Sequence, residues 1–434
     1  MKSLNRKVVI LTVFILANVS FAGNYSGGSG TETDPYQIGT VSDWNDLMNT
    51  PTDWDANFVM TADINLQGVP LIPVGNDING TYLYFRGIFD GNGHIIRNAT
   101  IAGYWHIGLF GLIDSNSQIR NLDVEDVIMS GERDIAGLVG ASKGTISNCY
   151  ATGKICDSLD RSANPGGLVG LNHGTIAASH AACDVNGIWA GGLVGRNFGT
   201  ITDSYADGTV NGYNCLGGLV GWNFGTITDS YAAGIVNGDR NVGGLVGSNA
   251  MVDIDYVGTI ARCYAAGSVS GNRSVGGLVG INGSSPEGGW FGWCSVTDCY
   301  ATGSVTGTDN VGGLVGYNYF GNATNCYAAG IVSGNSNVGG LIGSSVHPLD
   351  INCFWDVETS GQTISDGGTG LTTAEMRTLA TFTSAGWDFV DTWGIGENQT
   401  YPFLRTYSGA DLDYDGLVNL IDFAVLANHW LEGI

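Results

Sequence analysis

Residues 242–267 read VGGLVGSNAMVDIDYVGTIARCYAAG, and variants of this stretch recur along most of the chain. With the insertion Ala250–Val257 set aside, the unit is VGGLVGxNxGTIxx(C/S)YAxGxVxG, followed by polar residues. Its tetrapeptide GLVG, or a near variant, starts at Gly108, Gly137, Gly167, Gly192, Gly218, Gly244, Gly277, Gly313 and Gly340. The intervals run from 25 to 36 residues, and a repeat of this size indicates a solenoid or a propeller.

Each repeat holds three short segments of β-forming sequence: Gly-Leu-Val, Thr-Ile-x-x-(Cys/Ser)-Tyr and a segment centred on a valine. They are separated by Gly, Asn, Asp and Ser, which adopt positive φ and tight corners at low cost. A propeller blade needs about 40 residues, more than this unit offers. We therefore expect an all-β fold, a parallel β-helix or β-solenoid whose coils stack about 4.8 Å apart.

Two columns of polar or small residues support this stacking. Asparagines two places after the tetrapeptide are expected to form a buried amide ladder: Asn172, Asn197, Asn223, Asn249, Asn282 and Asn318. Cysteine alternates with serine in the second column: Cys149, Ser179, Ser204, Ser230, Cys263, Cys299, Cys326 and Cys353. This exchange indicates a small buried side chain, so five of the nine cysteines are interpreted as packing residues. Cys156 and Cys183, in neighbouring coils, remain open as a disulfide pair.

The repeated GGLVG…GTI…CYATG unit resembles the GLUG repeat, which occurs in bacterial surface and secreted proteins. The resemblance covers roughly residues 100–355, and the flanking segments also resemble the lead-in and closing segments of that family. It implies a β-solenoid over 108–353, with caps at 23–107 and 354–405, since open sheet edges invite aggregation. A short helix over 41–48 is expected in the first cap.

The first 22 residues have the features of a secretory signal: an early positive charge, an apolar run at 8–19 and small residues before Gly23. No later apolar run reaches the about 20 residues of a membrane span. The whole chain has 16 basic and 40 acidic residues, a net charge of −24. This balance disfavours nucleic acids and anionic membranes and makes polyanionic substrates less suitable. The sequence predicts a secreted or extracellular protein, and attachment to the cell surface remains open.

Residues 411–422 match the loop of an EF-hand, with oxygen ligands at the spacing that calcium requires. The expected ligands are Asp411, Asp413, Asp415, the carbonyl of Leu417, Asn419 and Asp422. Aspartate at the last position and the apolar helix expected over 423–431 resemble a dockerin repeat, so we expect a small α-helical calcium-loop segment over residues 406–434. The resemblance implies calcium as the bound ion and a cohesin-like module as a partner. Because dockerins carry two such segments and this chain one, we favour a surface-anchoring or sorting tag.

The sequence offers little that indicates catalysis. None of the six histidines begins an H-E-x-x-H motif, and Ser142, within a G-x-S-x-G string, falls at the asparagine position of its coil. The acidic residues Asp203, Asp229 and Asp298 lie at repeat turns and are interpreted as solvated corners, and no catalytic role is assigned to Asp90 or His94.

Exposed aromatic residues in long insertions can stack on sugar rings. The 36-residue interval contains such a cluster, and we list as candidate ligand-binding residues Trp290, Phe291 and Trp293. The alternative is that they pack back onto the coil. The leading hypothesis is a non-catalytic extracellular solenoid for surface display, adhesion or scaffold attachment. The alternative is a carbohydrate-active enzyme or a carbohydrate-binding accessory protein of a polysaccharide-degrading system.

Overall fold

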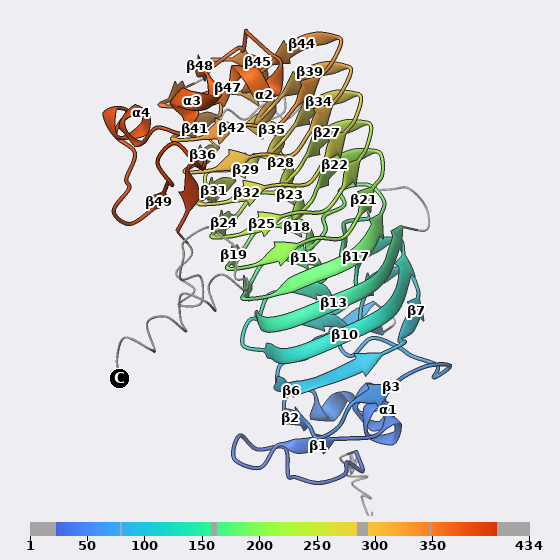
Figure 1. Cartoon of the computed structure of the whole chain (residues 1–434). Helices are drawn as coiled ribbons and strands as arrows, with labels where there is room; N and C mark the ends of the chain where they lie inside the picture. The colour runs from blue at the N-terminus through green and yellow to red at the C-terminus, as the bar shows by residue number, and fades with distance from the viewer. Residues whose placement is uncertain (1–22, 79, 158–162, 284–293, 348, 406–434) are drawn as a thin grey trace, which may run out of the picture.

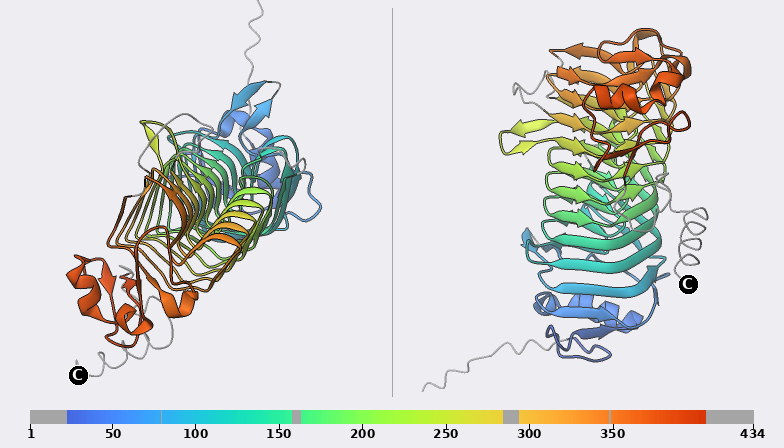
Figure 2. Two further views of the ribbon diagram at one scale, coloured as in Figure 1. Left: turned by 90° about the horizontal axis from the view of Figure 1, so that it is seen from above. Right: turned by 60° about the vertical axis from the view of Figure 1, so that its left-hand side comes forward.

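The computed structural model describes residues 23–78, 80–157, 163–283, 294–347 and 349–405. In these residues the chain winds into an elongated stack of coils, with the N-terminal coils at one end and the C-terminal coils at the other (Figures 1 and 2). Successive coils pair in parallel and in register, as where Val220 lies opposite Val246. The parallel β-solenoid that the repeat predicts is thus confirmed.

The tetrapeptide and the asparagine of each repeat form one face of the stack, the nine-stranded sheet. Its strands are β9 (Phe110–Ile113), β12 (Val139–Ser142), β15 (Val169–Asn172), β18 (Val194–Asn197), β23 (Val220–Asn223), β28 (Val246–Asn249), β35 (Val279–Gly283), β40 (Val315–Tyr319) and β45 (Ile342–Val346). Ser142 lies opposite Asn172, which confirms that it occupies the ladder position.

The remaining strands of each coil divide differently from the sequence prediction of three segments. The Thr-Ile…Tyr segment is split into two strands, as β24 (Thr226–Thr228) and β25 (Tyr231–Ala232), because Asp229 between them has a φ of +50°. A third strand, β26 (Val236–Asn237), follows, and all three belong to the 27-stranded sheet. The residues before the tetrapeptide form a separate five-stranded sheet: β22 (Asn214–Gly217), β27 (Arg240–Gly243), β34 (Arg273–Gly276), β39 (Asp309–Gly312) and β44 (Ser336–Gly339).

The interior of the stack is filled by the apolar residues of the repeat. The leucine of the tetrapeptide is fully buried in successive coils: Leu168, Leu193, Leu219, Leu245, Leu278, Leu314 and Leu341. Burying a leucine side chain stabilises a fold by about 1.5–3 kcal/mol, so this column is a large part of the core. The glycine before it is required by close packing, because a Cβ on Gly218 would collide with the carbonyl oxygen of Gly244 and lie 2.9 Å from the Ala232 Cβ.

The predicted asparagine ladder is present along the inside corner. Asn197, Asn223 and Asn249 are fully buried, and each donates from Nδ2 to Oδ1 of the asparagine in the next coil at 2.9 Å. Because an amide both donates and accepts, each of these asparagines accepts a hydrogen bond from one neighbouring coil and donates one to the other. The ladder ends where Asn318 Nδ2 donates to Asp350 Oδ1, at 3.3 Å.

The cysteine and serine column is also buried, as the exchange of the two residues predicts. The serine hydroxyls accept from backbone N–H groups of the preceding coil, and Cys299 Sγ accepts likewise from Cys263 N at 3.4 Å. The cysteines of this column are free. Cys156 and Cys183 are free as well, because the strand register places Cys183 opposite Gly153 and Cys156 opposite Asn186.

The N-terminal end of the stack is covered by α1 (Val41–Asn49), where the sequence predicts a helix over 41–48. Thr40 and Asp43 form a capping box at its start. The buried Trp44 packs edge-on against Phe89 and Phe110, with ring centroids 5.9 and 6.0 Å away. The helix thus closes the apolar interior of the first coils.

The C-terminal segment covers both the last coil and one side of the stack (Figure 1). At the end, β48 (Thr369–Leu371) pairs with β47 (Phe354–Asp356), which α2 (Val357–Ser360) follows. The chain then continues through α3 (Thr373–Met376), α4 (Leu379–Ser384), β49 (Trp393–Gly394) and β50 (Phe403–Leu404). These pack over the stacked tyrosines of the final coils, where Tyr327 Oη donates to the Pro402 carbonyl at 2.6 Å.

Candidate functional site

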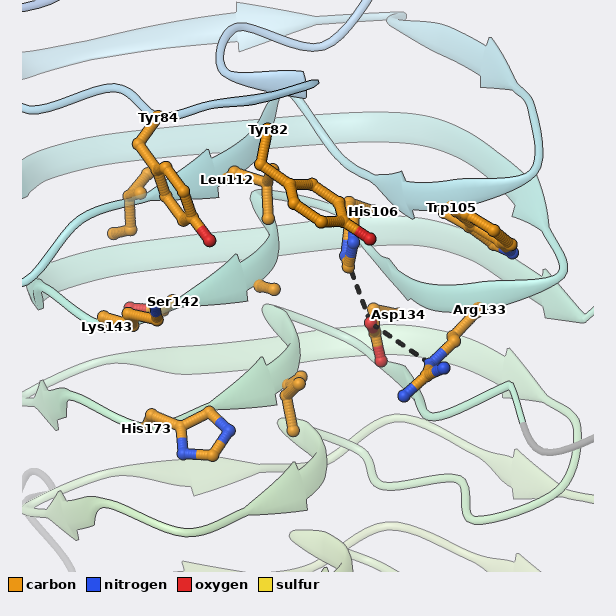
Figure 3. A pocket seen from close by; sticks show the side chains of 13 residues that line it. Tyr82, Tyr84, Trp105, His106, Leu112, Arg133, Asp134, Ser142, Lys143 and His173 are labelled. Atoms are coloured by element: carbon orange, nitrogen blue, oxygen red, sulfur yellow. Dashed lines mark ion pairs between the residues drawn. The ribbon is translucent and has the colours of Figure 1, made fainter. Parts of the chain in front are cut away.

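A cleft of about 270 Å³ opens on the outer surface of the nine-stranded sheet, in the N-terminal half of the stack (Figure 3). We call it the aromatic cleft. Its lining consists of aromatic, apolar, basic and a few other polar side chains: Tyr82, Tyr84, Trp105, His106, Leu112, Ile113, Arg133, Asp134, Ala141, Ser142, Lys143, Leu171 and His173.

Two tyrosines form one wall of the cleft. Tyr82 lies in β5 (Thr81–Leu83), which forms a hairpin with β4 (Asn76–Ile78), and Tyr84 follows this hairpin directly. The next residue, Phe85, bridges to Ile113 of β9. Tyr82 and Tyr84 are two residues apart on an extended chain, so their side chains leave it on the same side. Tyr82 is 49% exposed, which leaves a large part of its ring free to contact a ligand.

The opposite wall is formed by β8 (Trp105–Ile107) and β11 (Arg133–Ala136), in which Trp105 and Arg133 lie opposite each other. Trp105 is 52% exposed. His106 and Asp134 follow at left-handed corners, with φ of +54° and +53°. These corners turn both side chains toward the cleft, as Figure 3 shows.

Asp134 is the fully buried polar centre of the cleft. Its Oδ1 accepts a hydrogen bond from Asn164 Nδ2 at 2.7 Å. Its Oδ2 lies 3.1 Å from His106 Nδ1 and 3.7 Å from Arg133 Nε, within ion-pair distance but without an aligned hydrogen bond. The carboxylate is enclosed beneath the surface of the cleft, where it lies beside His106 and the more exposed Arg133.

The third side of the cleft is basic. Lys143 Nζ lies 4.9 Å from the centre of the Tyr84 ring, a cation–π contact. His173 occupies the same position one coil further on, since its N–H donates to the Ser142 carbonyl. Burial, together with the charges of Lys143 and Arg196, lowers the pKa of His173. His173 is therefore neutral at pH 7 and presents a polar aromatic ring.

This arrangement suits a flat ligand that carries hydroxyl groups. Exposed aromatic rings on two walls offer apolar stacking surfaces, and the polar groups between them fix orientation. Asp134 is the single carboxylate that lines the cleft. In the part of the chain that the structure describes, no group of three or more His, Cys, Asp or Glu side chains is arranged to hold a metal ion.

Most of the candidate residues that the sequence suggests belong to segments outside the described ranges. Trp290, Phe291 and Trp293 fall outside the described residues, as do the signal segment and the whole calcium loop, Asp411, Asp413, Asp415, Leu417, Asn419 and Asp422. Asp90 and His94 do not converge, because Asp90 pairs with Arg120 at 2.9 Å and His94 with Asp63 at 3.2 Å.

The aromatic cleft was not predicted from the sequence. The available signal was the concentration of aromatic residues in the non-repetitive stretches 82–85 and 104–105, away from the periodic tyrosine position. The other described insertion is a hairpin of β29 (Met251–Asp253) and β30 (Tyr256–Val257), and Tyr256 packs edge-on against Phe198 with ring centroids 5.3 Å apart.

The GLUG motif matches this chain at residues 131–155, 190–211, 212–237, 271–306 and 307–333, so the chain contains GLUG repeats. Halomucin of Haloquadratum walsbyi is 31% identical over 170 residues, 37% of this chain and 2% of halomucin. A protein of Evansella cellulosilytica named "Putative Gly-rich membrane protein" is 44% identical over 66 residues, 14% of this chain and 8% of that protein. The chain therefore matches only a small part of either relative.

Among solved structures, the chain is similar to "a putative immunoglobulin A1 protease from Bacteroides ovatus". The TM-score is 0.43 at 17% identity, over 88% of this chain and 95% of that one. No helix of the described ranges is long and apolar enough to span a membrane.

Proposed function

We propose that this protein is a non-catalytic solenoid of the cell surface or extracellular space that adheres to a polysaccharide through the aromatic cleft. The observation that carries the proposal is the pairing of half-exposed rings, Tyr82 and Trp105, with the exposed guanidinium of Arg133 in the same cleft. Sugar rings present an apolar face to aromatic side chains, and hydroxyl groups that donate and accept hydrogen bonds at their edges. Both kinds of contact are available here within one cleft.

The surface location is supported by the relatives, one named halomucin and the other a membrane protein. The acidic composition of the chain suits a solvated extracellular setting. The absence of a second carboxylate from the lining of the cleft supports adhesion over hydrolysis, because glycoside hydrolysis ordinarily uses two.

A glycan array probed with the full chain would identify the ligand, and substitution of Trp105 would locate its site. We expect Trp105→Ala to weaken binding of the selected glycan by about tenfold, since stacking on one ring contributes up to about 1.5 kcal/mol. Tyr213→Ala is the matched control, because Tyr213 is similarly exposed, at 48%, but does not line the cleft. Equal loss in both variants, or in neither, would refute the assignment of the cleft.

A carbohydrate-active enzyme is the second candidate. The observation in its favour is the closeness of His106, Arg133 and Asp134 in the cleft, a set that contains a proton acceptor and a cation. Chain cleavage of the bound glycan distinguishes this candidate from adhesion.

We further propose that the loop at residues 411–422 binds calcium and serves as an attachment tag. The carboxylates of Asp411, Asp413, Asp415 and Asp422 repel one another unless a cation joins them. A single unpaired loop should bind calcium with a dissociation constant of about 10⁻⁵ to 10⁻³ M.

Asp415→Ala should abolish this calcium binding in a calorimetric titration of the full chain while leaving the thermal transition of the solenoid nearly unchanged. The loop follows the repeats in sequence and supplies none of their ladder residues. Asp203→Ala, at an exposed repeat corner, is the control. Calcium uptake that is the same in wild type and Asp415→Ala would place the ion elsewhere.

A further inference from the structure

The aromatic cleft continues along the nine-stranded sheet into the following coils. Leu171, in its lining, lies opposite Arg196 of the next coil, and Arg196 lies opposite Trp222. His173, also in the lining, stacks on Phe198 with ring centroids 4.7 Å apart and planes 6° from parallel. A surface of rings therefore extends from the cleft along the direction of the stack.

Arg196 lies at the centre of this extension, enclosed by aromatic rings. Its guanidinium carbon is 4.8 Å from the centre of Phe198, 5.0 Å from Trp222 and Phe224, and 5.8 Å from Trp189. Arg196 Nε is buried and has no hydrogen-bond partner. Burial lowers its pKa, yet a guanidinium remains charged at neutral pH. The site thus holds a partly desolvated cation with donors that are not all used.

A basic residue without a carboxylate partner is unexpected in a chain with 40 acidic and 16 basic residues. Several described arginines have such a partner: Arg86, Arg97, Arg120, Arg133, Arg240, Arg262 and Arg273. Within the described ranges, Arg196 and Lys143 form no ion pair and contact aromatic rings instead, as does Arg377, which faces Tyr401 in the C-terminal segment and not in this sheet. Both lie near His173, since both lower its pKa. The protein therefore keeps two cations available along one face.

We propose that the ligand of this face is an acidic glycan, whose carboxylate or sulfate ester is bound by Arg196, with Lys143 as a second anion contact. This inference rests on the proposed function and names the chemical class of its ligand. A planar guanidinium donates to both oxygens of such a group, and the surrounding rings hold it in position and exclude water. The sugar rings then stack on the aromatic side chains of the cleft.

The net charge of −24 argues against attraction of polyanions at long range. The contacts proposed here act at short range in a partly buried site, where screening by salt is weak. We therefore expect binding of the acidic glycan to depend only weakly on salt between 50 and 300 mM, unlike a non-specific interaction, which weakens steeply.

Four oligosaccharide probes test the inference by calorimetric titration of the full chain: oligogalacturonate hexamer, its methyl ester, a sulfated carrageenan hexamer and its desulfated form. We expect tighter binding of at least one charged probe than of its neutral partner. The pair in which the charged probe binds more tightly than its neutral form shows whether the bound group is a carboxylate or a sulfate. Arg196→Gln should lower the affinity for the charged probe by about tenfold and change the affinity for its neutral form by less than about twofold.

Lys143→Gln provides a second variant in case Arg196→Gln does not fold, and Arg196→Lys should restore part of the affinity. Arg240→Gln is the control, because Arg240 also faces an aromatic ring, Tyr213 at 5.9 Å, but lies in the five-stranded sheet. Charged and neutral probes bound equally, or an equal loss in Arg240→Gln, would overturn the anion site while leaving glycan adhesion intact. No binding of any probe or of any array glycan would instead overturn the proposed function.

Discussion

Asn223→Ala should lower the free energy of unfolding of the solenoid by about 3–5 kcal/mol. Asn223 Oδ1 accepts from Asn197 Nδ2 at 2.9 Å and from Gly225 N at 3.3 Å. Its Nδ2 donates to Asn249 Oδ1 at 2.9 Å and to the Gly225 carbonyl at 3.1 Å. Alanine removes all four bonds in a fully buried position. Asn197 Nδ2 keeps the Gly199 carbonyl and the Gly225 carbonyl keeps Thr259 N, but Gly225 N and Asn249 Oδ1 lose their partners. Each unsatisfied group costs about 1–3 kcal/mol without being fully additive.

Chemical denaturation followed by circular dichroism would measure this loss. Asn237→Ala is the matched control, because Asn237 makes a similar amide bond to Asn211 Oδ1, at 3.1 Å, on the exposed surface. Its loss should cost less than about 1 kcal/mol, since water replaces the partner. A cost for Asn223→Ala no greater than that of the control would contradict the structural importance of the buried ladder.

Asp350→Asn should stabilise the protein at pH 8 by about 1–2 kcal/mol and remove one component of its pH dependence. Burial, and secondarily the charge of Asp366, raises the pKa of the Asp350 carboxyl to about 7 from an ordinary value of 3.8. Between these values the folded state keeps a proton that the unfolded state has lost. The unfolding free energy contributed by this group therefore falls as pH rises from about 4 to about 7.

The difference in unfolding free energy between wild type and Asp350→Asn, measured from pH 4 to pH 8, isolates this group from the other carboxylates. Asparagine preserves the shape of the residue and the acceptor for Asn318 Nδ2 at the end of the ladder. Asp203→Asn, at an exposed corner, should leave the pH profile parallel to that of wild type. A difference that stays constant with pH, or that grows as pH falls, would show that Asp350 is not buried as a protonated acid.

The repeat allowed the solenoid, the asparagine ladder and the cysteine column to be predicted because each follows from a residue recurring at a fixed place. Because the coils stack in register, a residue that recurs at one place in the repeat, such as Asn223, forms a column of equivalent contacts along the stack. The division of the Thr-Ile…Tyr segment could not be predicted in this way. It depends on the left-handed conformation of Asp229, and the same position also holds Ala178 and Arg262, which do not favour positive φ.

The cleft could not be predicted from the sequence, because its residues do not recur at a fixed place in the repeat. Tyr82 belongs to a hairpin in the non-repetitive first coils, and Asp134 looks like one more corner aspartate. Only stacking places Asp134 beside His106 and within the same cleft as Tyr82, more than fifty positions apart in the sequence. The aromatic cluster that the repeat spacing did single out, Trp290, Phe291 and Trp293, lies outside the described residues, and its role in binding stays a prediction.

Adhesion through the aromatic cleft is tested most directly by incubating the array-selected glycan with the full chain and with the Tyr82→Ala/Trp105→Ala double variant. Affinity and glycan mass are followed in the same mixtures. We predict saturable binding by wild type, an affinity about 100-fold lower in the double variant, and glycan of unchanged mass after prolonged incubation. An unchanged affinity in the double variant, or the appearance of shorter glycan fragments with wild type, would contradict the assignment of a non-catalytic adhesion site.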